Sequence, residues 1–257
     1  MSYGRFAYYY DALMEEAPYS SWVEFALSAW RLYGLKDDKS LLDLGSGTGQ
    51  LSIRFASEGF SVTGVDLSSE MLSVARSKAE EAGMNIPFYE QNMAELELPG
   101  QYGMCGIFCD SLNYLCSENE VTETFERVAN HLVPGGLLVF DVHSVHKVAE
   151  GFINHSFSLN GDEVAYIWDS FEGEHPNSVE HEISFFILDE QSGKYDRFDE
   201  IHYQRTFPVE AYTAWLQNAG FEVLQIGADF DLAAPSADSE RIFFIARKPL
   251  NKSSHSL

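Results

Sequence analysis

Residues 41–50 read Leu41-Leu42-Asp43-Leu44-Gly45-Ser46-Gly47-Thr48-Gly49-Gln50, an apolar stretch followed by three alternate glycines. Glycine has no Cβ atom, so the chain can turn sharply here and its backbone can touch a ligand. The helical pattern that follows offers backbone N–H groups without partners at its start. Because ligands of open α/β sheets bind at the carboxyl ends of the strands, this loop predicts a ligand site.

A carboxylate follows at the end of the next expected strand, where Asp66 comes directly after Val62-Thr63-Gly64-Val65. An acid at this place can accept hydrogen bonds from both hydroxyls of a ribose. The loop and the acid together predict a ligand of the adenosine type. The dinucleotide-binding motif requires glycine at its sixth position, where this chain has Gln50. A nicotinamide-dependent oxidoreductase is therefore the less favoured interpretation.

The loop, with Asp43 two residues before its first glycine, resembles motif I of the class I S-adenosylmethionine-dependent methyltransferases. The resemblance covers roughly residues 38–142 and 206–247, and includes segments 91–93, 109–114, 133–136 and 219–221. It implies that S-adenosyl-L-methionine is the cofactor, with Asp43 and the glycines at its methionine end, Asp66 at the ribose and segment 91–93 at the adenine. The implied cofactor-binding residues are Asp43, Gly45, Ser46, Gly47, Gly49, Asp66, Leu67, Met71, Gln91, Asn92, Met93, Cys109, Asp110 and Ser111.

Alternating strand and helix patterns predict an α/β fold with a mainly parallel sheet. Helices are expected at residues 6–14, 20–32, 50–57, 69–82, 118–131 and 208–219, and core strands at 40–44, 61–65, 86–90, 104–109, 137–141, 221–226 and 241–246. The resemblance implies a Rossmann-like, seven-stranded sheet of order 3-2-1-4-5-7-6, in which strand 7 is antiparallel and helices lie on both faces.

A different pattern occupies residues 156–205, which hold three or four long strand patterns without a helix between them. This pattern predicts an antiparallel β insertion after strand 5. We therefore divide the chain into an N-terminal helical lid (1–37), a methyltransferase core (38–147 and 206–248) and an antiparallel β insertion (148–205) that covers the substrate.

The expected chemistry is methyl transfer by in-line displacement to a small molecule with a nitrogen or oxygen nucleophile. Alignment and exclusion of water supply most of the acceleration, and a general base is needed only if the acceptor arrives protonated. Each candidate for substrate positioning also has a purely structural interpretation, such as a core aromatic, a structural hydrogen bond or a surface ion pair. The candidates are Tyr10, Tyr114, His143 and Arg205, with Tyr8, Tyr9, Asn113 and Trp168 as further possibilities.

The charge of the chain is strongly negative, because 16 Lys and Arg face 40 Asp and Glu, for a net −24. Such a field repels a phosphate backbone and suits a neutral or cationic acceptor, although acidity can also serve solubility alone. Nucleic acid is therefore a disfavoured partner. Two alternatives stay open, an RNA methyltransferase and a non-catalytic module that binds S-adenosyl-L-methionine.

The three cysteines, Cys105, Cys109 and Cys116, are too few for a disulfide framework. The first residues lack the apolar run of a signal peptide, and no 18-residue apolar run predicts a membrane span. We therefore expect a cytoplasmic protein. His143 and His146 are spaced like metal ligands but lack an evident carboxylate or cysteine partner, so no metal is expected. The oligomeric state leaves no trace in the sequence.

Overall fold

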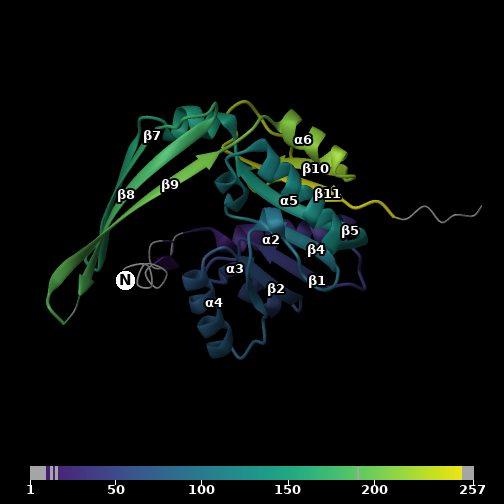
Figure 1. Cartoon of the computed structure of the whole chain (residues 1–257), viewed down its shortest axis with the longest axis horizontal. Helices are drawn as coiled ribbons and strands as arrows, with labels where there is room; N and C mark the ends of the chain where they lie inside the picture. Colours follow the sequence, from purple (N-terminus) through teal and green to yellow (C-terminus); the bar gives the residue numbers. More distant parts are fainter. Residues whose placement is uncertain (1–9, 12–13, 15–16, 190, 251–257) are drawn as a thin grey trace, which may run out of the picture.

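The computed structural model describes residues 10–11, 14, 17–189 and 191–250. The chain forms a seven-stranded sheet covered by helices and a separate four-stranded sheet that projects from it (Figure 1). Most of the helix predicted at residues 6–14, including Tyr8 and Tyr9, lies outside the described residues. Within the described ranges, no helix is both long and apolar enough to cross a membrane.

The seven-stranded sheet has the order β10-β11-β5-β4-β1-β2-β3. In chain order its strands are β1 (Ser40–Leu44), β2 (Ser61–Asp66), β3 (Phe88–Glu90), β4 (Tyr102–Ile107), β5 (Leu132–His143), β10 (Glu222–Ala228) and β11 (Arg241–Arg247). β1 pairs in parallel with β2 and β4, whereas β11 is antiparallel to both β5 and β10. With the four strands of the second sheet left out of the count, this is the order 3-2-1-4-5-7-6, which confirms the predicted fold class.

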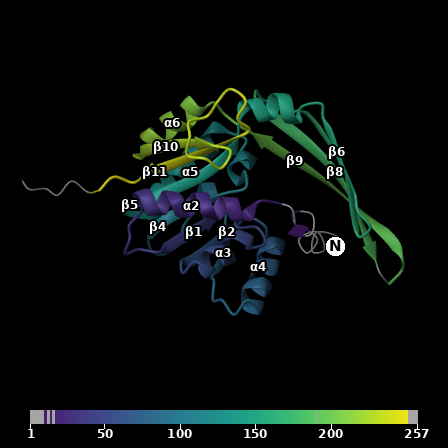
Figure 2. The same ribbon diagram turned by 180° about the vertical axis from the view of Figure 1, so that it is seen from behind.

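Helices cover both faces of this sheet because its strands are nearly continuous apolar runs, whose side chains point to both faces. In β1, Leu41 packs into the core on one face, whereas Leu42 and Leu44 pack into the core on the other. Helices α2 (Tyr19–Tyr33), α3 (Gln50–Ser57) and α4 (Ser69–Glu81) cover the first face, and α5 (Glu118–His131) and α6 (Val209–Asn218) cover the second. Figure 2 shows α2 lying across the first face.

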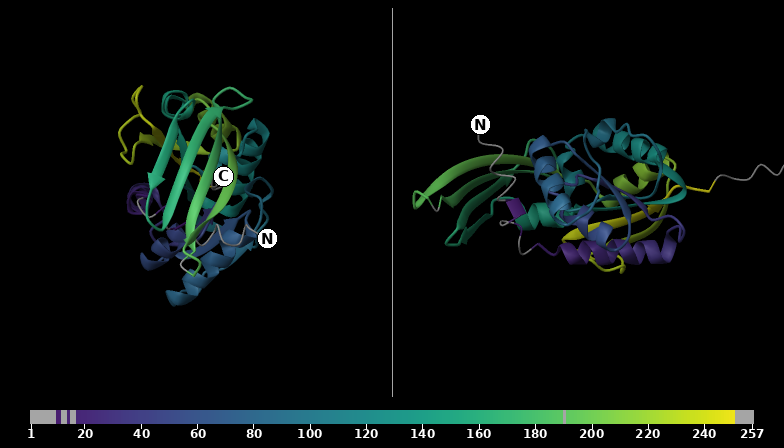
Figure 3. Two further views of the ribbon diagram at one scale, coloured as in Figure 1. Left: turned by 90° about the vertical axis from the view of Figure 1, so that its left-hand side faces the viewer. Right: turned by 90° about the horizontal axis from the view of Figure 1, so that it is seen from below.

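The second sheet is fully antiparallel and contains β6 (Ser156–Asn160), β7 (Val164–Glu172), β8 (Ser178–Asp189) and β9 (Lys194–Arg205) in chain order. It extends from the core as a curved arm (Figure 3). At its base, Val179 packs with Val148 and Phe152 of the π-helix η3 (Lys147–Phe152). Four strands agree with the three or four expected from sequence.

The base of the second sheet is also tied to the core by hydrogen bonds around the buried Asn113. Its Nδ2 atom donates to the backbone oxygen of Arg205 at 2.8 Å, and its Oδ1 atom accepts from the backbone nitrogen of His143 at 2.9 Å. The Thr206 hydroxyl donates to the backbone oxygen of the same histidine. The last residue of β9 and the end of β5 are therefore joined through one side chain.

Several element boundaries differ from the sequence prediction. β4 ends at Ile107 rather than at Cys109, because Cys109 and Asp110 adopt positive φ angles of 55° and 52°. β5 begins at Leu132 rather than at residue 137, so residues 134–136 lie inside a strand whose pairing with β4 is irregular. The π-helix η3 was not predicted.

Candidate active site

A cavity of about 610 Å³ lies beside the glycine loop, at the carboxyl ends of β1, β2 and β4. Every residue predicted for cofactor binding lines this cavity except Gly49. Gly49 instead precedes α3 with a left-handed φ of 77°, and a Cβ atom added there would lie 3.0 Å from the Cβ atom of Ala75 in α4. The absence of a side chain at Gly49 therefore lets the loop pack against α4, and its contact with a ligand stays a prediction.

The glycine loop is held to β2 by its own backbone. The backbone N–H groups of Gly45 and Ser46 both donate to the backbone oxygen of Val65, at 2.8 and 2.9 Å. A Cβ atom on Gly45 would lie 2.6 Å from the Cβ atom of Ser111. The segment after β4 can therefore pack this closely only against a glycine. Gly47, with a φ of 52°, has nothing within 4 Å of an added Cβ atom. The loop therefore presents bare backbone to open space.

Asp66 faces this loop from the end of β2. Its Oδ2 atom accepts a hydrogen bond from the Gly47 N–H at 2.7 Å, and its Oδ1 atom accepts from the Ser68 N–H at 2.9 Å. Burial raises the pKa of this carboxyl, while the backbone N–H donors oppose that change. The Ser68 hydroxyl caps α4 by accepting from the Met71 N–H, and the neighbouring Leu67 and Met71 line the cavity.

Asp43 lies at the base of the cavity and is only 2% exposed. The Ser52 hydroxyl donates to its Oδ2 atom. Burial raises the pKa of Asp43 to about 6, the Ser52 hydrogen bond opposes this, and the negative charge of Asp66 adds to it. A cationic group placed here would restore the charged form, because an opposite charge favours an ionised carboxylate.

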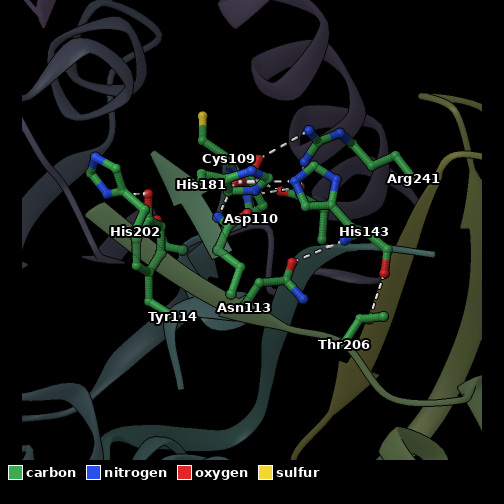
Figure 4. A network of polar contacts seen from close by, with 12 residues as sticks. Cys109, Asp110, Asn113, Tyr114, His143, His181, His202, Thr206 and Arg241 are labelled. Carbon is green, nitrogen blue, oxygen red and sulfur yellow. Dashed lines mark hydrogen bonds and ion pairs between the residues drawn. The ribbon is translucent and has the colours of Figure 1, made fainter. Parts of the chain in front are cut away.

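A buried charge network supports the segment after β4 (Figure 4). The backbone N–H groups of Cys109 and Asp110 donate to the two carboxylate oxygens of Asp141, at 3.0 and 3.1 Å. The Arg241 guanidinium contacts Asp141 and also lies 3.0 Å from Asp110 Oδ1. Trp22 Nε1 donates to Asp141 from α2 at 2.9 Å. The strained left-handed backbone at residues 109 and 110 is therefore held in place by charged hydrogen bonds.

The two acids of this network respond differently to their surroundings. Burial alone would raise the pKa of Asp110, but His143 and Arg241 outweigh it and hold that pKa well below its usual range. Burial raises the pKa of Asp141, and Arg241 opposes the rise. Sequence reasoning missed Asp141 and Arg241 as parts of the site, because their partners lie far away in the chain.

The four residues predicted to position the substrate fall into two groups. Tyr10 and Tyr114 line the cavity, whereas His143 and Arg205 are not among its lining residues. His143 is buried with its Nε2 atom 3.3 Å from Asp110 Oδ2. The Arg205 guanidinium donates to the backbone oxygens of Cys116 and Pro176, so the structure places its charge away from the cavity.

Sequence reasoning also missed His202, which reaches the cavity from β9 of the second sheet. Successive residues of a strand point to opposite faces, so Glu200, His202 and Gln204 share one face and Arg205 lies on the other. Gln204 Nε2 donates to Asp110 Oδ2 at 2.9 Å, which brings this face against the core. The period-2 pattern could have identified His202 in place of Arg205.

Comparison with known proteins gives a matching family, a similar sequence and a similar solved structure. Residues 41–136 match a family described as a methyltransferase domain. A Geobacillus sp. (strain WCH70) protein named as a methyltransferase is 49% identical over 96% of this chain and 100% of its own length. A crystal structure of a S-adenosylmethionine-dependent methyltransferase from Clostridium acetobutylicum ATCC 824 matches with a TM-score of 0.86 and 28% identity, over 97% of this chain and 100% of that one.

A more distant relative has a named substrate. The dTDP-3-amino-3,4,6-trideoxy-alpha-D-glucopyranose N,N-dimethyltransferase of Streptomyces venezuelae is 27% identical over 72% of this chain and 76% of its own length. Taken with the strand order, these similarities show that the chain belongs to the class I S-adenosylmethionine-dependent methyltransferases. It is an enzyme of methyl transfer, and S-adenosyl-L-methionine is its cofactor.

Proposed function

We propose that the cavity beside the glycine loop binds S-adenosyl-L-methionine and presents its methyl group to an amine or hydroxyl of a small molecule. The observation that carries this proposal is the open backbone at Gly47, where an added Cβ atom would meet nothing within 4 Å. The buried Ser46 hydroxyl beside it has no hydrogen-bond partner among the described residues. Buried polar groups of this kind are normally satisfied, so a polar ligand at this place is favoured.

The acids of the cavity fit the parts of this cofactor. The buried Asp43 carboxylate suits the ammonium group of the methionine part, and Asp66 suits the two ribose hydroxyls. Asn92 and Met93 line the cavity beyond β3 and suit the adenine. When bound, the cofactor supplies a sulfonium methyl group that is already activated. The protein then aligns the acceptor and excludes water, which can supply up to about 7–11 kcal/mol.

The charge of the cavity supports a neutral or cationic acceptor. Among the described residues that line it, none is Lys or Arg, whereas Glu70 and Glu120 add to the three aspartates at its wall. An RNA acceptor would bring phosphates into this field and be repelled. The amino-sugar substrate of the Streptomyces venezuelae relative supports an amine as the acceptor group. The three free cysteines support a reducing compartment, the cytoplasm, as the place of the reaction.

Calorimetry and a turnover assay test this function in two stages. The full-length protein is titrated with S-adenosyl-L-methionine and with its demethylated product, and we expect dissociation constants of about micromolar order. The saturated enzyme is then incubated with amino sugars, aliphatic amines and phenols, and methylated products are detected by mass spectrometry. Absence of binding would contradict the cavity assignment, and binding without any product would contradict the acceptor class.

A further inference from the structure

Two polar side chains of the second sheet, Glu200 and His202, form a hydrogen-bonded chain with Tyr114 of the core at the cavity. His202 lies on β9, with its Nε2 atom 2.9 Å from Glu200 Oε2. Its Nδ1 atom lies 3.3 Å from the hydroxyl of Tyr114, which ends the 3-10 helix η2 (Ser111–Tyr114). The side chains of His202 and Glu200 are 25% and 15% exposed. Tyr114 and His202 both line the cavity, and Figure 4 shows them together at one end of the polar network.

The contacts decide which nitrogen of His202 can take a proton. An ionised carboxylate only accepts hydrogen bonds, so the contact with Glu200 places the imidazole hydrogen on Nε2. Nδ1 then carries a lone pair, to which the Tyr114 hydroxyl donates. The histidine is therefore oriented by an acid on one side and presents a basic nitrogen to the cavity on the other, which is the arrangement that general bases require.

We propose that His202 is the general base of methyl transfer, that Glu200 positions it, and that Tyr114 guides the acceptor to it. The inference rests on the proposed function of the cavity. An acceptor O–H or ammonium N–H replaces the Tyr114 hydroxyl as the donor to Nδ1. A hydroxyl passes its proton to Nδ1 as its oxygen lone pair forms the new bond to the methyl carbon. An ammonium group gives its proton to Nδ1 first, which frees the nitrogen lone pair for the attack. In both cases the C–S bond breaks and its electron pair stays on sulfur.

The other polar groups near the cavity suit this role less well. Asp110 is held by Arg241 and Gln204, and its low pKa makes it a weak base. Asp66 already accepts two backbone hydrogen bonds. His143 is not a lining residue of the cavity. Among the described groups, His202 combines access to the cavity with an acid partner and an available nitrogen. The assignment further specifies the substrate as one that arrives with a proton on its nucleophile.

Groups from three elements surround His202. On its own strand, Glu200 and Gln204 share its face, and His181 lies directly opposite on β8. Tyr114 contacts it from η2, and Asp110 reaches the same face through Gln204. Of these groups, Glu200 is the acid in direct contact. Its carboxylate orients the imidazole through the contact with Nε2.

A matched pair of acceptors isolates the proton transfer. At about pH 8, 4-nitrophenol is largely ionised, whereas phenol keeps its proton, with a pKa of about 10 like that of tyrosine. We expect His202→Gln to slow kcat for phenol by about 100- to 10,000-fold and to leave kcat for 4-nitrophenol nearly unchanged. The control is His175→Gln, which alters a histidine in the turn between β7 and β8 and should change neither rate. Equal slowing of both acceptors would overturn the assignment.

Three further measurements separate the role of His202 from a loss of folding or of cofactor binding. Nitrogen-15 NMR of the histidines, with the demethylated cofactor bound, should show His202 with its hydrogen on Nε2. Hydrogen on Nδ1 would overturn the proposal. Glu200→Gln should lower kcat for phenol and leave kcat for 4-nitrophenol nearly unchanged, because the imidazole loses the acid that orients it, and Glu200→Asp should restore much of the rate. Unchanged cofactor affinity in His202→Gln separates loss of the base from failure of the cofactor assignment.

Discussion

The Asp66 carboxylate accepts a hydrogen bond from the Gly47 N–H at 2.7 Å, so the end of β2 fixes the most open point of the glycine loop. The contact joins two neighbouring strands at the place where a nucleoside is expected to lie. A ribose that binds to Asp66 therefore meets an acid that is already oriented by the backbone. Preorganisation of this kind strengthens binding because little ordering remains to be done.

Replacement of Asp66 tests this contact. Asp66→Ala should weaken binding of S-adenosyl-L-methionine about 10- to 150-fold, because charge-assisted hydrogen bonds contribute about 1.5–3 kcal/mol. Calorimetry measures the loss. Asp38→Ala is the matched control, since Asp38 Oδ1 accepts the Ser40 N–H at the opposite end of β1. That variant should lose stability and keep its affinity. Equal affinities of Asp66→Ala and the wild type would contradict the site.

A methyl group at Gly47 should block the cofactor without unfolding the protein. Gly47→Ala places a Cβ atom in open space, so its cost is the left-handed backbone, about 1–2 kcal/mol. Gly83→Ala has a similar φ of 68° and also meets nothing within 4 Å, but it lies beyond the end of α4. Thermal unfolding should show similar losses for both variants, whereas only Gly47→Ala should lose cofactor binding. Retained binding would show that the ligand lies elsewhere.

The raised pKa of Asp43 predicts an unusual dependence of stability on pH. A buried carboxyl with a pKa of about 6 keeps its proton in the folded state at a pH where the unfolded state has lost it. The free energy of unfolding therefore falls as the pH rises from about 4 to about 6. Asp43→Asn should remove this fall and gain stability above pH 6 relative to wild type, on the order of 3 kcal/mol. Urea unfolding across this pH range measures the difference. Parallel curves for the two proteins would contradict the shift. The same variant should bind the cofactor more weakly.

Arg241 should be far more important for stability than a surface arginine on the same strand. Arg241→Met leaves Asp110 and Asp141 buried without their cation, which is expected to cost about 3–5 kcal/mol. Part of the loss should be recovered at low pH, where the two acids can take up protons. Arg247→Met removes only an exposed pair with Glu222 and should cost at most about 1 kcal/mol. Similar losses in urea unfolding would contradict the importance assigned to the network.

The parts of the site that depend on local chemistry could be predicted from sequence. The glycines, Asp66 and the Ser68 cap depend on residues within a few positions of one another and on the strand that precedes them. The order of the core strands followed from the family resemblance. The substrate roles of Tyr10 and Tyr114 remain predictions, although both line the cavity.

The rest depends on contacts between distant segments. Arg241 and Asp141 are 100 positions apart, and Trp22 and Asp141 are 119 apart, so no local pattern reveals their hydrogen bonds. The left-handed backbone at Cys109, which ends β4 early, is stabilised by one of these distant partners. Only His202 had a usable signal, the alternation along β9, because that pattern separates it from Arg205.

The Asn113 side chain, which joins the last residue of β9 to the end of β5, limits how the enzyme could acquire a new substrate range. A graft of strands β6–β9 from another methyltransferase would need to place a backbone oxygen where that of Arg205 lies, or leave the buried amide of Asn113 without its acceptor. The second sheet and the Asn113 side chain that joins it to the core are therefore expected to change together. Diversification of acceptors within this lineage should proceed by point changes on the inward face of the arm, such as those at residues 200–204, rather than by exchange of the whole segment.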